Sequence, residues 1–139
     1  MSEPENVAVQ TVEKLIAEYE NLHGRITPDG RLSERYDLHK QWNTTSFPNA
    51  ANAGCYFIFG RDGTLLYVGK ASLGSTVGRR LSTYFYWNTD DDVLAHSHDG
   101  WEDSQPSFVR TIPVLKAYQA ASLEEFLIDR LQPSHNTRK

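Results

Sequence analysis

GCYFIFGRDGTLLYVGK, from Gly54 to Lys70, is the stretch that decides the fold of this chain. Aromatic and branched residues dominate 54–59 and 64–69, and the intervening 60–63 is a turn signal, so the stretch predicts a β-hairpin. Because side chains alternate along a strand, one face of this hairpin is expected to be apolar and to pack on helices. That face carries Cys55, Phe57, Phe59, Leu66 and Val68.

The opposite face of the hairpin carries two tyrosines, and two registers are open for them. A turn centred on Arg61 and Asp62 places Tyr56 directly opposite Tyr67, whereas a turn on Asp62 and Gly63 makes the tyrosines diagonal neighbours. In both registers the two tyrosines share a face, although an odd offset between the strands would separate them. We expect the tyrosine face to be the one left available for function.

The flanking sequence predicts helices around the hairpin and one further strand. Periodicity and stop signals predict helices over 7–23, 33–42, 76–86 and 122–132, and a third strand over 107–112. Ser122 and Glu125 have the spacing of a capping box for the last helix. Residues 47–53 are interpreted as a linker, and the acidic residues 88–107 as a solvated loop rather than a metal site. The sequence thus predicts an α/β (α+β) fold.

Composition restricts the class of protein. The 139 residues match one domain, and no apolar run is long enough to cross a membrane. The acidic first residues lack the apolar region of a signal peptide, so we expect a cytoplasmic protein with no membrane partner. Cys55 is the single cysteine, which excludes a disulfide framework and a cysteine-based zinc site.

Charge is unevenly distributed along the chain. The net charge of −4 argues against a general nucleic-acid binder. However, residues 54–88 hold four basic side chains and one acidic one, whereas 89–104 hold six acidic side chains and no lysine or arginine. A local basic patch on an acidic protein predicts modest, salt-sensitive contact with phosphates.

A misplaced carboxylate marks the last predicted helix. At about 100° per residue, Glu124 lies within the apolar arc formed by Leu123, Leu127, Ile128 and Leu131. A carboxylate on such a face is costly unless it is paired or binds a metal. The alternative is that Glu124 favours the start of the helix dipole or pairs with an arginine. The residues alone leave both interpretations open.

These residues resemble the motifs of the GIY-YIG nuclease family. Gly54-Cys55-Tyr56 stands where the family has Gly-Ile-Tyr, and Tyr67-Val68-Gly69 where it has Tyr-Ile-Gly. The runs 67–71, 80–85, 123–128 and 133–136 are similar to the N-terminal nuclease domain of the bacterial excision-repair subunit that cuts 3′ of a lesion. The interval from Lys70 to Arg80 is about three residues longer here, which leaves Arg79 as an alternative to Arg80. Leu81 and Tyr84 favour Arg80.

The resemblance implies a fold and an activity. It implies a three-stranded central sheet flanked by helices in a nuclease domain over 54–139, with residues 1–53 as an added helical segment packed on it. It also implies a metal-dependent endonuclease that hydrolyses DNA phosphodiester bonds. The alternatives are a catalytically silent nucleic-acid or protein-binding module derived from such a nuclease, and an enzyme directed at RNA or single strands.

The resemblance also assigns roles to individual residues. The implied catalytic residues are Tyr56, Tyr67, Arg80, Tyr84 and Glu124, with Glu124 as ligand of one Mg²⁺ or Mn²⁺. The implied phosphate-binding residues are Lys70, Arg79 and Asn136. In this scheme one of the two strand tyrosines activates the attacking water as a phenolate. Its ordinary pKa of about 10 would then have to be lowered by Arg80, Lys70 or the metal.

Overall fold

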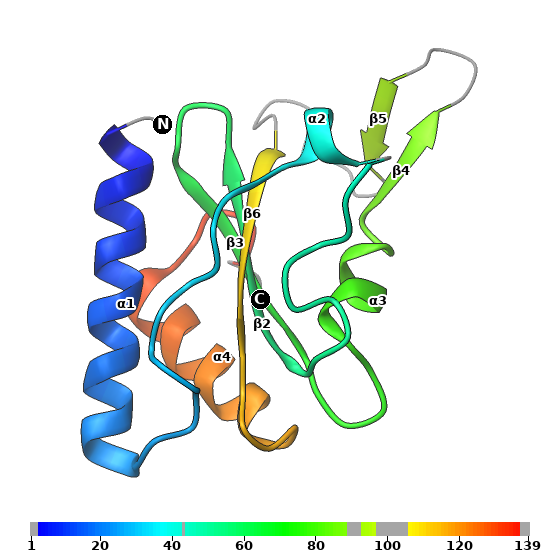
Figure 1. The fold of residues 1–139 in the computed structure, drawn as a ribbon. Coiled ribbons are helices and arrows are strands. Elements are labelled where there is room, and N and C mark those ends of the chain that lie inside the picture. Colours follow the sequence, from blue (N-terminus) through cyan, green and yellow to red (C-terminus); the bar gives the residue numbers. More distant parts are fainter. Residues whose placement is uncertain (1–2, 43, 89–92, 97–105, 137–139) are drawn as a thin grey trace.

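An antiparallel four-stranded sheet lies at the centre of the protein, in the order β1–β6–β2–β3 (Figure 1). The computed structural model describes residues 3–42, 44–88, 93–96 and 106–136. Within them the strands are β1 (Tyr36–Asp37), β2 (Gly54–Gly60), β3 (Leu65–Ala71), β4 (Phe85–Asn88), β5 (Val93–His96) and β6 (Pro106–Pro113). The helices are α1 (Glu3–His23), α2 (Leu38–Gln41), α3 (Val77–Leu81) and α4 (Gln119–Leu131).

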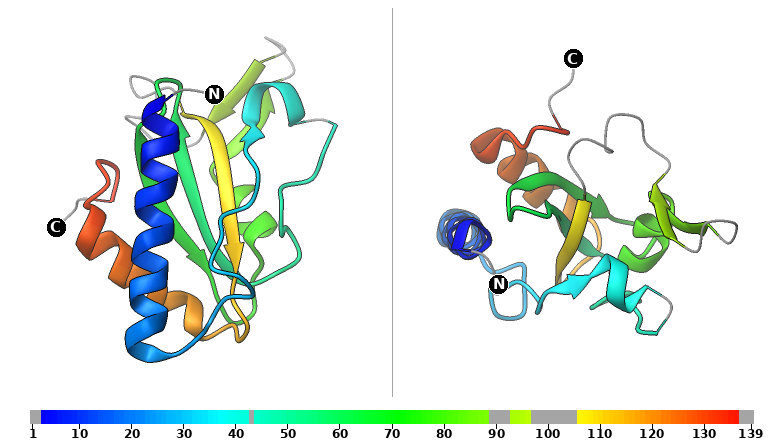
Figure 2. Two further views of the ribbon diagram at one scale, coloured as in Figure 1. Left: turned by 60° about the vertical axis from the view of Figure 1, so that its left-hand side comes forward. Right: turned by 90° about the horizontal axis from the view of Figure 1, so that it is seen from above.

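The mixed α/β class predicted from the sequence is confirmed, but the sheet has four strands rather than three. The additional strand is β1, which pairs with β6 through two residues and is too short to show a periodic pattern. Figure 2 shows α1 and α4 on one side of the sheet and α3 on the other. None of the helices in the described ranges is long and apolar enough to span a lipid bilayer.

The β2–β3 hairpin combines parts of both predicted registers. Its turn is centred on Arg61 and Asp62, because the Gly63 amide donates to the Gly60 carbonyl and Gly63 has a φ of 89°. Further along, however, Ile58 pairs with Tyr67. The register changes there because Leu66 is an extra residue on β3, a β-bulge. The bulge restores an even offset between the strands, so the two tyrosines are diagonal neighbours on one face.

One side of the sheet holds the first core cluster. Cys55, Phe57, Phe59 and Val68 project from it and are fully buried against α1 and α4, as the alternation predicts. Leu66 is the exception, because the bulge takes it out of the alternation. Leu65 packs on this face instead. The N-terminal segment contributes Val12, Ile16, Tyr19 and Ile26 to the same cluster.

The tyrosine side of the sheet is covered, which corrects the expectation that it is left open. Tyr56 and Ile58 are fully buried in a second core cluster with Tyr36, Leu38, Val77 and Leu81. Residues 36–42 and 44–53, which include most of the predicted helix over 33–42 and the predicted linker over 47–53, fold across this side together with α3. The carbonyls of Ala50 and Asn52 accept the amides of Gly78 and Val77, so these residues also fix the start of α3.

All four predicted helices have different bounds in the structure. α1 begins at Glu3 rather than at residue 7, and α2 covers only Leu38–Gln41 of the predicted 33–42. α3 ends at Leu81 rather than at 86, because the chain tightens into turns in which Thr83 and Tyr84 donate to Arg80 and Leu81. α4 begins at Gln119, so Ser122 lies inside the helix and its hydroxyl bonds Tyr19 instead of capping. The capping-box prediction is therefore wrong.

The segment 88–107, predicted as a loop, is partly strand. β4 and β5 pair as an antiparallel ladder beside the main sheet (Figure 1). The acidic side chains of this segment fall within 89–92 and 97–105, which lie outside the described residues.

A buried ion network ties the start of α1 to β6. Glu5 is fully buried, and its carboxylate accepts from the Nε and Nη2 of Arg110 at 3.2 and 3.1 Å and from Arg35 at 3.2 Å. Arg110 also donates to the Ser33 carbonyl. Removing one partner from such a network leaves a buried charge without compensation. This network fixes the N-terminal helix against the sheet.

Candidate active site at the edge of strand β3

Three tyrosine hydroxyls meet beside strand β3. The Tyr56 and Tyr84 oxygens are 2.9 Å apart, and the Tyr84 hydroxyl donates to the Tyr67 oxygen at 3.2 Å. A hydroxyl has one proton to donate, so Tyr56 must be the donor to Tyr84. Tyr56 and Tyr84 are buried, whereas Tyr67 is half-exposed on the edge strand. The hydrogen bonds among the three hydroxyls therefore lead from the core to the half-exposed Tyr67.

Arg80 joins this group from α3. The Thr76 hydroxyl caps the helix by accepting the Arg79 amide, so the turn that carries Arg80 is fixed at its start. The exposed guanidinium of Arg80 interacts electrostatically with all three tyrosines, most strongly with Tyr56. A planar guanidinium offers several donors to a phosphate group. Arg80 is therefore placed to hold an anion over the tyrosine hydroxyls.

Glu124 reaches the same edge from the opposite side of the sheet, on α4. Burial raises the pKa of the Glu124 carboxyl, and the positive charges of Lys70 and Arg80 oppose that rise. The negative charge of Glu124 in turn contributes to raising the pKa of Tyr67. β3 is the outer strand of the sheet, so groups from the α3 side and the α4 side meet around it. The structure thus brings together Tyr56, Tyr67, Tyr84, Arg80, Lys70 and Glu124.

Arg79 lies outside this group. Its side chain is exposed, and none of the interactions among the described residues links it to the tyrosines or to Glu124. Neighbouring residues on a helix point about 100° apart, which separates Arg79 from Arg80. Between the two arginines that the sequence offers, the geometry favours Arg80 as the residue beside the tyrosines.

Asn136 is used by the backbone of β3. Its Oδ1 accepts the Val68 amide at 2.7 Å, and its Nδ2 donates to the Val68 carbonyl at 3.0 Å. The His135 amide also donates to the Leu66 carbonyl at 2.9 Å. The Asn136 side-chain amide thus forms the hydrogen bonds to Val68 that a neighbouring strand would otherwise form. Asn136 therefore positions Val68, the residue next to Tyr67. Contact of Asn136 with phosphate stays a prediction.

We expect Asn136→Ala to lower the free energy of unfolding by about 1–2 kcal/mol, because two hydrogen bonds to Val68 are lost at a partly buried edge. Chemical denaturation measures the change, and amide hydrogen exchange at Val68 locates it. Asn52→Ala, the same change at an exposed position, serves as the control. Unchanged exchange at Val68 in Asn136→Ala would contradict the role.

Burial opposes the ionisation of the Tyr56 and Tyr67 hydroxyls to phenolates. Desolvation raises the pKa of Tyr56 and of Tyr67 well above the ordinary range of a phenol, and the hydrogen bonds with Tyr84 act in the same direction. Arg80 lowers both values but does not outweigh burial. The protein groups alone therefore keep these hydroxyls protonated at neutral pH, where they act as hydrogen-bond donors and acceptors.

Glu124 fits the requirements of a divalent cation. Within the described residues its half-buried carboxylate forms no hydrogen bond or ion pair with a protein group, although it lies near two basic side chains. The described residues contain no group of three or more metal-binding side chains. Mg²⁺ is commonly held by one or two carboxylates together with waters and a substrate phosphate. One carboxylate beside a phosphate-binding arginine suits that arrangement.

Sequence reasoning missed the segment that orients α3. Residues 47–53 show no periodicity, so the sequence predicts only a linker, yet their carbonyls receive the first amides of the helix that carries Arg80. Asn49 has a φ of 57° and donates from its amide to the Thr111 hydroxyl at 2.9 Å. Asparagine is enriched at such left-handed positions, which is the signal that the sequence offered.

Comparison of the sequence with models of protein families and with curated proteins found no match. The function of this site therefore has to be inferred from its own residues and their chemistry.

Proposed function

We propose that this protein is a metal-dependent endonuclease of the GIY-YIG type that hydrolyses DNA phosphodiester bonds. The observation that supports the proposal best is the convergence of three tyrosine hydroxyls, Arg80 and Glu124 at one edge of the sheet. These groups come from β2, β3, α3, the turn after α3 that carries Tyr84, and α4. Packing of the core alone gives no reason for a carboxylate to join them.

Each residue has a defined task in the proposed reaction. Arg80 and Lys70 bind the phosphate and compensate its negative charge. Tyr67, polarised by the series from Tyr56 through Tyr84, orients the attacking water by hydrogen bonding. Glu124 holds the cation. When bound, Mg²⁺ or Mn²⁺ supplies Lewis-acid stabilisation of the charge that develops on the phosphate.

Incubation with supercoiled plasmid tests the proposal. We expect nicking with Mg²⁺ or Mn²⁺ and none in EDTA. Arg80→Ala is expected to lower the nicking rate by about 10² or more, since charge stabilisation in the transition state is lost. Arg79→Ala is the matched control, because it removes the same charge from the neighbouring position and is expected to cost less than about tenfold.

Three results would overturn the proposal. Equal loss in the two arginine variants would show that overall charge matters rather than the site. DNA binding in EDTA without cleavage under any metal would indicate a silent binding module. Cleavage of RNA in place of DNA would overturn the choice of substrate.

A further inference from the structure

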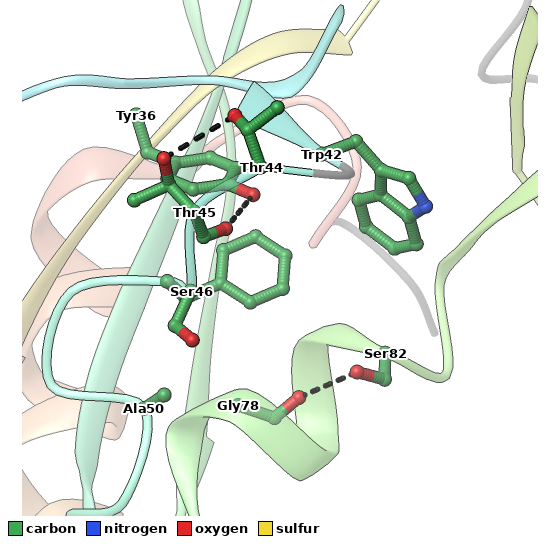
Figure 3. Close-up of a pocket in the computed structure, with 9 residues that line it drawn as sticks. Tyr36, Trp42, Thr44, Thr45, Ser46, Ala50, Gly78 and Ser82 are labelled. Atoms are coloured by element: carbon green, nitrogen blue, oxygen red, sulfur yellow. Dashed lines mark hydrogen bonds between the residues drawn. The ribbon is translucent and has the colours of Figure 1, made fainter. Parts of the chain in front are cut away.

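A cavity lies beside α3, next to Gly78 and Ser82. It has a volume of about 570 Å³ and is lined by Tyr36, Trp42, Thr44, Thr45, Ser46, Phe47, Ala50, Gly78 and Ser82. Figure 3 shows Trp42, Thr44, Thr45 and Ser46 along one side and Gly78 and Ser82 of the α3 region along the other. The volume is within the usual range for small-ligand sites.

The lining of this cavity selects a neutral, flat ligand. None of its nine residues is charged, so the cavity does not bind a phosphate by itself. Trp42 and Phe47 are half-buried, and their rings meet at 76° with centroids 5.8 Å apart. A planar group can stack on one ring and place its edge against the other. A nucleobase has this shape and stacks on aromatic side chains regardless of its identity.

Hydroxyl groups form the rim of the cavity. Thr44, Thr45 and Ser46 are exposed, and the Ser82 hydroxyl donates to the Gly78 carbonyl at 2.8 Å, which leaves its oxygen as an acceptor. A threonine or serine hydroxyl rotates to donate or accept. Such a rim satisfies the polar edge of any base, so we expect little preference among the four bases.

The position of α3 connects the cavity to the candidate active site. Gly78 and Ser82 are four residues apart and face the cavity. Arg79 follows Gly78 by about 100° around the helix, and Arg80 by about 200°. A strand that passes around α3 from Arg80 therefore meets Arg79 before it reaches the cavity. The helix is about 10 Å across with its side chains, so half of its circumference is about 16 Å, or about five base rises of 3.4 Å.

We propose that this cavity receives one unpaired nucleobase of the substrate strand, a few nucleotides from the bond held at Arg80. The inference rests on the proposed nuclease function and adds a substrate class to it. A base inside a duplex cannot enter the cavity, so the preferred substrate has an unpaired or splayed nucleotide near the cut. Arg79 then holds the phosphate between the two positions, which gives this exposed residue a task.

Ser46→Trp tests the proposal by filling the cavity from an exposed position. Binding is measured in EDTA by fluorescence anisotropy, with a single-stranded oligonucleotide, a duplex and an abasic strand of equal length. We expect Ser46→Trp to weaken binding of the single strand about tenfold and to leave the duplex and the abasic strand within about twofold, because one stacked base is lost. Trp42→Ala is expected to give the same pattern, and circular dichroism checks that both variants are folded.

Equal binding of the single strand by both variants and wild type would overturn the inference, as would equal weakening on the abasic strand. These outcomes are separable from a failure of the proposed function. If the protein is not a nuclease, plasmid nicking is absent in wild type, whereas the binding pattern in EDTA is still measured. If only the cavity is misassigned, Ser46→Trp nicks the plasmid at the wild-type rate and shows no selective loss.

Discussion

Glu124→Gln is expected to lower the rate of DNA cleavage by about 10³ or more while DNA binding stays within a few-fold of wild type. The glutamine keeps the size of the side chain but loses the charge that would hold the cation. A bound metal contributes several kcal/mol to stabilising the transition state, and each 1.36 kcal/mol is a factor of about ten in rate. Single-turnover cleavage at saturating protein measures the effect without the contribution of binding.

Glu125→Gln is the matched control, since it makes the same change at the next residue, which is exposed. The pH profile gives an independent check. Because burial raises the pKa of Glu124, its carboxylate is protonated at a higher pH than an ordinary glutamate. Wild-type activity should therefore rise as pH increases through that raised pKa, and residual activity in Glu124→Gln should lack this step. Equal activity losses in the two variants would contradict the role of Glu124.

Gly69→Ala is expected to destabilise the protein by about 3 kcal/mol, the upper end of what overpacking costs. A Cβ at Gly69 would lie 2.3 Å from the Cζ and 2.5 Å from the hydroxyl oxygen of Tyr56. The Tyr56 ring lies across Gly69 because the two residues pair between β2 and β3. Tyr56 is fully buried and cannot move aside. Thermal or urea denaturation measures the loss, and cleavage should fall with it as the Tyr56 hydroxyl is displaced.

A double variant shows whether the cause is this contact. In a Tyr56→Leu background the ring is absent, so Gly69→Ala should cost much less than in wild type, and the two changes should not be additive. Additive costs would mean that Gly69 is required for another reason, such as the geometry of the strand. The glycine of the Tyr-Val-Gly motif would then not serve to accommodate the buried tyrosine.

The sequence predicts the elements that carry a periodic pattern. Alternation located β2 and β3 and placed Tyr56 and Tyr67 on one face, and apolar spacing located α1 and α4. The register was not predictable, because it depends on two local irregularities, the left-handed Gly63 and the extra Leu66. Either one alone gives an odd offset and would have put Tyr67 on the face of Phe57. Their combined effect is set by packing on both sides of the sheet.

The candidate site was predictable where a residue is out of place for its element. Glu124 interrupts an apolar face, and the structure brings its carboxylate near Lys70 and Arg80. The burial of the tyrosine face was not predictable, because the covering residues 36–42 and 44–53 contain only the short β1 and α2 and are positioned by contacts distant in sequence. The role of Asn136 on β3 was also not predictable, since a hydrogen bond to a residue 68 positions away leaves no local signal in the sequence.

The hydrogen bonds that the Asn136 side chain forms with Val68 also bear on self-association. The outer strand of a sheet exposes unpaired backbone groups, and such groups recruit other chains into aggregates. In this protein one outer strand, β1, is only two residues long. On the other, β3, the backbone of Leu66 and Val68 is occupied by His135 and Asn136. The last residues of the described chain therefore protect the side of the sheet next to Tyr67 from pairing with another molecule.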